Sequence, residues 1–215
     1  MISVVMPTMW RNNKTIRLLD SLNLDPNISE IILIDNDVKS KNIDLSKFSK
    51  VKYIPQTENI YVNPAWNLGI SLCKSEIICI SNDDIYFDSN VVTQFVLDNS
   101  QDLGSFGLNM HTRNGSSIGN ISKKELMTRS EISNAIVGSG FGMLMFVKKS
   151  NWKPIPEELK IWYGDNWIAN THGRAFILSM YGSNLEVDRH TTAGSKELKK
   201  ITMEDSKAWP NYKNI

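Results

Sequence analysis

The chain has 215 residues, of which 41% are hydrophobic and 22% charged, and its 24 basic and 23 acidic side chains leave a formal net charge of +1. These values are typical of a globular protein and exclude a disordered, collagen-like or coiled-coil chain. The length suits one domain. The charge is too small to make a polyanion such as duplex DNA the default partner.

The sequence indicates neither a membrane span nor export. No apolar run approaches the roughly 20 residues that cross a bilayer, and the opening MISVVMPTMW has neither a basic segment nor a signal cleavage site. Cys73 and Cys79 fall in a helical pattern and in an apolar strand, which favours buried free thiols over a disulfide. We therefore expect a cytoplasmic protein.

The first hundred residues alternate apolar runs with amphipathic stretches. Apolar runs such as residues 30–34 suit strands that are buried on both faces of a parallel sheet. Asn63 and Pro64 offer an N-cap and a first-turn proline for one helix, and Asp88 is placed to cap another. Strands are predicted at residues 2–6, 30–34, 51–54 and 76–81, and helices around 16–22, 63–73 and 88–96. This order indicates an α/β fold.

The second half of the chain is less regular. Residues 104–110 and 135–147 resemble longer strands interrupted by glycine, whereas 111–134 are polar and irregular. The remaining prediction is a short helix at 162–172, strands at 175–181 and 185–187, and a closing helix at 195–209.

Three predicted strands end in polar residues, namely Pro7-Thr8, Asp35-Asn36-Asp37 and Asn82-Asp83-Asp84. In an open parallel sheet, ligands bind beyond the carboxyl ends of the strands, near the point where the strand order reverses. The chain has no glycine-rich motif of the kinds that cradle phosphates with backbone amides. A phosphate ligand would therefore need a divalent cation, held by one or two carboxylates and by the ligand's own diphosphate.

Six segments follow one another in a specific order and spacing. They are VVMPTMWRN, IILIDND, NPAWNLGI with IICISNDD, VGSGFGMLMFVKKSNW, YGDNWI and RHTTAGS. Together they resemble the glycosyltransferases with the GT-A fold, especially family 2-like enzymes and compact viral or phage members. The resemblance implies an α/β fold with a Rossmann-like mixed sheet flanked by helices, as a single domain over residues 1–215. Residues 1–100 would form its nucleotide-binding half and residues 101–215 its acceptor half.

The resemblance also implies a nucleotide pocket at the strand ends. By position, Pro7 and Thr8 would line the pocket, and Asp35 would contact the base. Asn63 and Asn67 would lie beside the nucleotide on their helix.

The same resemblance assigns a metal and a base. Asn82-Asp83-Asp84 stands at the DxD-type motif, with Asn in place of the first Asp; Asp83 would lie near the ribose and Asp84 on Mn²⁺ or Mg²⁺. His190 would complete the metal site. Asp165 stands where inverting members carry the catalytic base, although the usual Glu-Asp pair is Gly-Asp here.

Each of these residues also has a structural interpretation. Asp83 and Asp84 suit a turn after a strand, as Asn-Asp clusters usually do, and Asp35 suits an acidic turn. Asp165 suits the N-cap of its short helix. His172 suits the negative end of a helix dipole.

The resemblance implies metal-dependent, inverting transfer of a sugar from a nucleoside-diphosphate sugar, by default a UDP-sugar, to a hydroxyl acceptor. Trp152, Trp162 and Trp167 in the acceptor half, with the near-neutral charge, favour a glycan acceptor over nucleic acid.

Two alternatives stay open. One is transfer to a hydroxymethylated base of phage DNA, and the other is a catalytically silent domain that binds a nucleotide sugar. A nucleotidyltransferase is disfavoured because MPTMWRNNK lacks the glycines of its usual loop. A DNA backbone would have a basic patch to bind, formed by Arg11, Lys14, Lys196, Lys199, Lys200 and Lys207.

Overall fold

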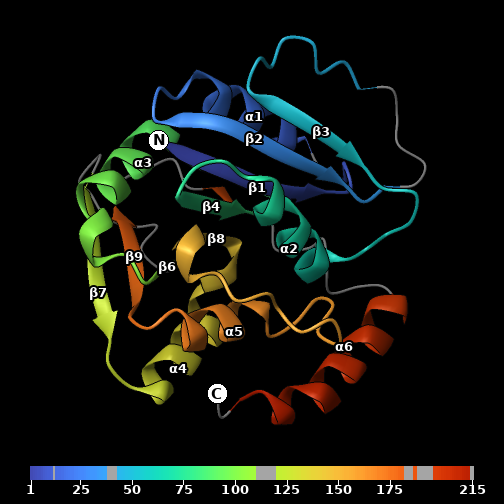
Figure 1. Ribbon diagram of the computed structural model, residues 1–215, viewed down its shortest axis with the longest axis vertical. Coiled ribbons are helices and arrows are strands. Elements are labelled where there is room, and N and C mark those ends of the chain that lie inside the picture. Colours follow the sequence, from blue (N-terminus) through green and yellow to red (C-terminus); the bar gives the residue numbers. More distant parts are fainter. Residues whose placement is uncertain (12, 38–42, 110–119, 182–185, 188–195, 214–215) are drawn as a thin grey trace.

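A computed structural model describes the chain except for residues 12, 38–42, 110–119, 182–185, 188–195 and 214–215 (Figure 1). The described strands form an eight-stranded mixed sheet in the order β3-β2-β1-β4-β8-β6-β9-β7, and β5 pairs separately with β10. Figure 1 shows β1, β2 and β3 toward one end of the molecule and α4, α5 and α6 toward the other.

The first half of the chain builds the parallel part of the sheet, in which β1 pairs in parallel with both β2 and β4, and β2 with β3. Its strands are β1 (Ile2–Thr8), β2 (Ile28–Asp35), β3 (Val51–Pro55), β4 (Ile77–Ser81) and the short β5 (Ile85–Tyr86). Its helices are α1 (Lys14–Leu24), α2 (Val62–Leu72), α3 (Ser89–Asp98) and the 3₁₀ turn η1 (Ser100–Asp102).

The second half adds strands of mixed direction, starting with β8, which runs antiparallel to β4. These strands are β6 (Ser105–Asn109), β7 (Asn120–Leu126), β8 (Leu144–Lys148), β9 (Ala175–Tyr181) and β10 (Glu186–Val187). The helices are α4 (Arg129–Ser139), α5 (Gly164–Thr171) and α6 (Lys196–Ala208), with 3₁₀ turns η3 (Phe141–Met143), η4 (Lys149–Asn151) and η5 (Trp209–Asn211).

The central strands are buried on both faces, as their unbroken apolar runs predict. Along β1, Val4 and Met6 pack into one core with α1 and α3, whereas Val5 packs into the other core with α2, α4 and α5. Gly69 lets α2 lie close against β1, because a Cβ atom there would lie 2.3 Å from a methyl carbon of Val5. The helices on both faces thus fix the strand ends that carry the polar residues.

The prediction of a strand over residues 135–147 is wrong, because α4 occupies its first part. Thr128 and Glu131 form a capping box that starts this helix, with Thr128 Oγ1 accepting from the Glu131 amide at 3.1 Å. Gly140 ends it in the left-handed region at φ 72°, and β8 begins only at Leu144. The segment that the sequence suggested to be irregular, 111–134, also contains β7 and the start of α4.

Smaller differences concern helix starts. The N-cap of α2 is Tyr61, at φ 66°, and Asn63 lies in the first turn instead. Asp88 does cap α3, accepting from the Val91 amide, and Cys73 and Cys79 are free and buried as expected. Within the described part of the chain, no helix has the length and apolarity that a membrane crossing requires.

Candidate active site

The polar strand ends meet where the strand order reverses, since β1 lies between β2 and β4. Thr8, the last residue of β1, is in register with Asp35 at the end of β2. The Thr8 hydroxyl also donates to Asp83 Oδ2 at 2.5 Å, across to the turn that follows β4. The structure therefore brings Thr8, Asp35 and Asp83 together, and Pro7 precedes Thr8 on β1.

Asp83 is held by hydroxyl groups from two elements. Besides Thr8, the Thr15 hydroxyl in the first turn of α1 lies 3.3 Å from Asp83 Oδ2. Burial raises the pKa of Asp83 to about 6, and the charge of Asp84 acts in the same direction, whereas the bonds from Thr8 and Thr15 oppose the rise. Asp84 itself is only 7% exposed.

This adjacent pair of carboxylates fits a divalent cation. Mg²⁺ and similar hard ions are commonly held by one or two carboxylates together with substrate phosphates, and a cation would relieve the repulsion between Asp83 and Asp84. Among the residues that the structure describes, no three His, Cys, Asp or Glu side chains gather into a metal site. His190, the predicted additional ligand, lies outside the described residues.

The Asp35 carboxylate is buried and has two aromatic partners. The Trp10 indole donates to Asp35 Oδ2 at 2.9 Å and the Tyr53 hydroxyl at 2.5 Å. Trp10, two residues beyond β1, adopts φ 54°, and its amide donates to the Thr8 hydroxyl. Sequence reasoning missed both aromatic residues, although Trp10 lies within VVMPTMWRN. Contact of Asp35 with a nucleobase stays a prediction. The nucleobase would have to share the Asp35 carboxylate with the Trp10 indole and the Tyr53 hydroxyl, or replace them.

Asn63 and Asn67 hold a segment of the second half. Asn67 Nδ2 donates to the Ile155 carbonyl and Asn67 Oδ1 accepts from the Ile155 amide, at 2.9 Å each. Asn63 is fully buried, and its Nδ2 donates to the carbonyls of Leu159 and Trp162, at 3.1 Å each. The contact with a nucleotide expected for both asparagines stays a prediction, since the structure shows them supporting this segment.

Residues 159–165 lead into α5 and present Asp165 in its first turn. We call them the base turn, after the candidate catalytic base Asp165. The N-cap of α5 is Tyr163, at φ 65°, so Asp165 is not the helix cap that the structural interpretation suggested. Burial raises the pKa of Asp165 to about 6, against the bond from the Asn166 amide. A carboxylate with such a pKa is ionised at neutral pH yet more basic than an exposed one.

The turn η3 connects Asp165 with the triplet after β4. Gly142 lies directly against Asp165, because a Cβ atom there would be 2.8 Å from Asp165 Oδ2. The next residue, Met143, accepts a hydrogen bond from the Asn82 amide at 2.9 Å. The triplet Asn82-Asp83-Asp84 and Asp165 thus both contact one short turn.

The three tryptophans of the acceptor half do not form one surface. Trp167 is buried, and its indole donates to the Lys153 carbonyl, whereas Trp152 packs edge-on against His172. Trp162 is 50% exposed. His172 does lie at the carboxyl end of α5, as predicted. It is buried, and burial lowers its pKa to about 4, so it does not carry the positive charge that the helix dipole would favour.

The basic patch is described in part. On α6, Lys199 and Lys200 are exposed, and Lys200 lies 3.9 Å from Glu204, one helical turn along. This is the solvated helix face that such a charge run usually forms.

Comparison with solved structures shows a similar fold. The S. aureus fragment TarS 1-349 has a TM-score of 0.62 and 13% identity, covering 98% of this chain and 72% of that one. Its complex with UDP has a TM-score of 0.63 and 13% identity, with 98% and 66% coverage. A longer S. aureus TarS structure has a TM-score of 0.62 and 15% identity, and this chain spans only 43% of it.

These likenesses confirm the GT-A fold. No curated protein sequence matches the chain. The family model described as glycosyl transferase family 2 matches residues 3–146, from β1 into β8. Because this match covers more than half of the chain and includes the strand ends of the candidate site, the chain belongs to glycosyl transferase family 2.

Proposed function

We propose that the protein transfers a sugar from a nucleoside-diphosphate sugar to a hydroxyl group of a glycan, with inversion at the anomeric carbon and with Mn²⁺ or Mg²⁺ as cofactor. The observation that carries the proposal is the arrangement around η3, which has the acidic triplet on one side and Asp165 on the other. A UDP-sugar is the proposed donor, since solved TarS structures hold UDP and UDP-GlcNAc.

Residues 1–100 supply the proposed donor site. Thr8 and Thr15 hold the Asp83 carboxylate, which would lie near the ribose. Asp35 would accept a hydrogen bond from the nucleobase. Asp84, with Asp83 beside it and His190 in addition, would hold the cation. The bound cation would neutralise the charge that grows on the departing diphosphate.

Asp165 is the proposed catalytic base. Its carboxylate removes the acceptor's hydroxyl proton while that oxygen attacks the anomeric carbon and the bond to the diphosphate oxygen breaks. One in-line displacement of this kind inverts the anomeric configuration. Burial keeps Asp165 basic enough for this role, and the backbone of Gly142 restrains it.

Trp162 supports a glycan as the acceptor. Its ring is half exposed three residues before Asp165, and its indole nitrogen is fixed by a 2.7 Å bond to the Thr202 hydroxyl. A fixed aromatic face of this kind suits the apolar face of a sugar ring. Transfer to a modified DNA base is the alternative, and it would make acceptor binding fall steeply with salt concentration.

The test is a transfer assay with UDP-, GDP- and dTDP-sugars and candidate glycans, with Mn²⁺, Mg²⁺ or EDTA, read by mass spectrometry and by NMR of the anomeric product. The proposal expects transfer with a cation and an inverted product. Donor binding without transfer or hydrolysis would instead identify a silent nucleotide-sugar-binding domain. A product of retained configuration would contradict the role of Asp165 as base.

A further inference from the structure

Asp205 on α6 is a fully buried carboxylate outside the proposed chemistry. It accepts hydrogen bonds from three consecutive backbone amides of the base turn. Oδ1 accepts from Lys160 at 3.0 Å, and Oδ2 accepts from Ile161 and Trp162 at 2.8 Å each. Such convergence of amides on one anion offsets the cost of burying its charge and fixes the backbone that donates.

The base turn is held on its other side by α2. The Asn63 amide donates to the Lys160 carbonyl at 3.0 Å, and its side chain binds the carbonyls of Leu159 and Trp162. The amides of the turn therefore bind Asp205 and its carbonyls bind Asn63. The turn is fixed between α2, in the first half of the chain, and α6, in the second.

Tyr163, which follows Trp162 in the chain, has a backbone conformation that costs energy. Tyr163 lies at φ 65°, a region that costs a residue with a side chain about 1 kcal/mol or more. Its ring stacks on Trp209 at 5.1 Å, and its hydroxyl lies 3.1 Å from the Ser206 hydroxyl. Asp165 follows two residues later, so its position depends on this turn.

We infer that Asp205 is a positioning residue for catalysis, which fixes the base turn and thereby holds the Asp165 carboxylate at the reacting atoms. The inference rests on the proposed function of Asp165. Asp205 does not touch the substrate, and it acts only through the backbone that leads to the base.

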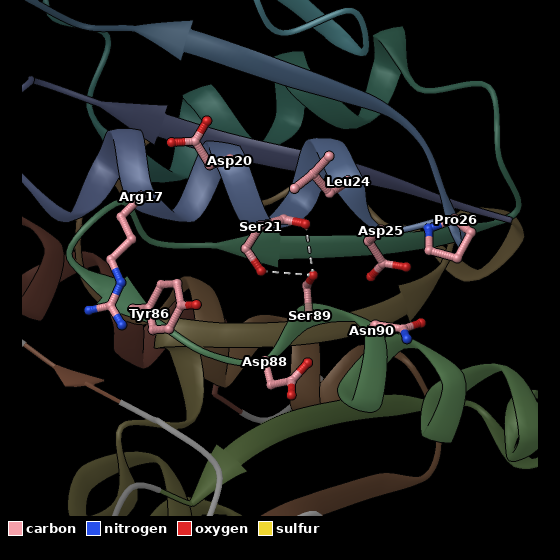
Figure 2. A pocket seen from close by; sticks show the side chains of 10 residues that line it. All are labelled: Arg17, Asp20, Ser21, Leu24, Asp25, Pro26, Tyr86, Asp88, Ser89 and Asn90. Carbon is pink, nitrogen blue, oxygen red and sulfur yellow. Dashed lines mark hydrogen bonds between the residues drawn. The ribbon is translucent and has the colours of Figure 1, made fainter.

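Asp25 provides a matched control. It is also buried, and it accepts bonds from the Asn27 amide at 2.9 Å and the Thr93 hydroxyl at 2.8 Å. Figure 2 shows it in an open pocket between α1 and the start of α3. Because Asp25 lies just before β2, it is at the amino ends of the parallel strands, away from the candidate site.

The experiment compares Asp205→Asn with Asp25→Asn in the full chain. In Asp205→Asn the new NH2 group faces a backbone N–H donor, whereas in Asp25→Asn it faces the Thr93 hydroxyl, which can turn to accept. Both variants are expected to lower the thermal midpoint, Asp205→Asn by more. At a temperature where both are folded, Asp205→Asn is expected to lower kcat about 10²-fold, as small misplacements of reacting groups do, without changing UDP affinity. Asp25→Asn is expected to keep the wild-type kcat. Equal losses of kcat in the two variants would overturn the inference.

A double-mutant cycle tests whether the effect passes through Asp165. If it does, Asp205→Asn causes little further loss in an Asp165→Asn background. A full additional loss there would overturn the inference. If Asp165→Asn alone keeps the wild-type rate, the proposed base is wrong, and that result is visible without any Asp205 variant.

Hydrogen exchange supplies a readout that needs no activity. Amides of the base turn are expected to exchange faster in Asp205→Asn and at the wild-type rate in Asp25→Asn. Unchanged exchange would overturn the inference whatever the activity. Ser206→Ala, at an exposed position, removes the contact with the Tyr163 hydroxyl and the bond to the Thr202 carbonyl within α6; we expect it to remain folded and to lower kcat by a smaller factor in the same direction.

Discussion

Thr8 and Asp35 end strands β1 and β2, and Asp83 follows β4 by two residues. The turn that leads to Asp165 is instead bonded to the helices α2 and α6. On the donor side, the parallel ladder sets the positions, since Thr8 and Asp35 are register partners. On the acceptor side, the base turn depends on Asn63, Gly142 and Asp205, which come from three separate parts of the chain. The two sides should therefore respond differently to substitution.

The donor side should show the largest loss. Asp84→Ala, or EDTA, is expected to abolish transfer, because stabilisation of the departing diphosphate by a cation is worth several kcal/mol. The measurement is the transfer rate with Mn²⁺ present. Asp88→Ala, which removes only the exposed cap of α3, is the control and should cost about 1 kcal/mol of stability at unchanged rate. Full activity in EDTA would refute the metal role.

On the acceptor side, Asp165→Asn is expected to lower kcat by about 10²- to 10⁴-fold, the usual contribution of a general base. It keeps the shape of the side chain and removes only its proton affinity, so UDP binding should be unchanged. Single-turnover rates and calorimetric titration with UDP separate the two effects. A variant with the wild-type rate would show that another group takes the proton.

The pH dependence of kcat tests whether the base turn controls Asp165. Because burial raises the pKa of Asp165 to about 6, and the base acts in its ionised form, kcat should fall about tenfold per pH unit below that value. The rate should be nearly level between pH 7 and 8. In Asp205→Asn the acid limb of the kcat profile should move to lower pH. A loosened base turn exposes the Asp165 carboxyl to water, which lowers its pKa. An acid limb that is the same in both proteins would indicate that the turn does not control Asp165.

Asp35→Asn should weaken binding of the nucleotide sugar and leave kcat nearly unchanged, because a contact with the nucleobase is the same before and during the reaction. The expected rise in donor KM is about tenfold, the usual scale for a hydrogen bond to a charged group. Tyr53→Phe is the control, since it removes one of the two aromatic donors to Asp35 and keeps the carboxylate. A fall in kcat instead would place Asp35 in the chemical step.

The smallest effect is expected at Trp162. Trp162→Ala should raise the acceptor KM a few-fold, because a single aromatic contact is worth about 0.5–1.5 kcal/mol. Met203→Ala, also at an exposed position of this region, should change nothing. Acceptor binding that weakens steeply with salt would favour the DNA acceptor over the glycan.

Local patterns were sufficient for much of the donor side. The runs IILIDND and IICISNDD are apolar strands followed by acid, and the parallel strands of an α/β sheet end at the same edge, so the meeting of Asp35 and Asp83 could be predicted. Period and capping signals likewise predicted most helices. They failed at residues 135–147, where the Thr128 and Glu131 capping box outweighed the alternating glycines.

The tertiary structure alone decided how these residues are held. Pattern places Asn63 near the start of a helix and Asp205 on a lysine-rich helix. It does not show that both bind the base turn, which lies nearly a hundred residues from Asn63 and over forty from Asp205 in the sequence. The same holds for Trp10 and Tyr53 on Asp35. Hydrophobic periodicity fixes which face of an element is buried, whereas hydrogen bonds between distant loops depend on how the elements pack. The sequence by itself therefore determined the family, the fold and the acidic strand ends, and packing determined which polar groups support them.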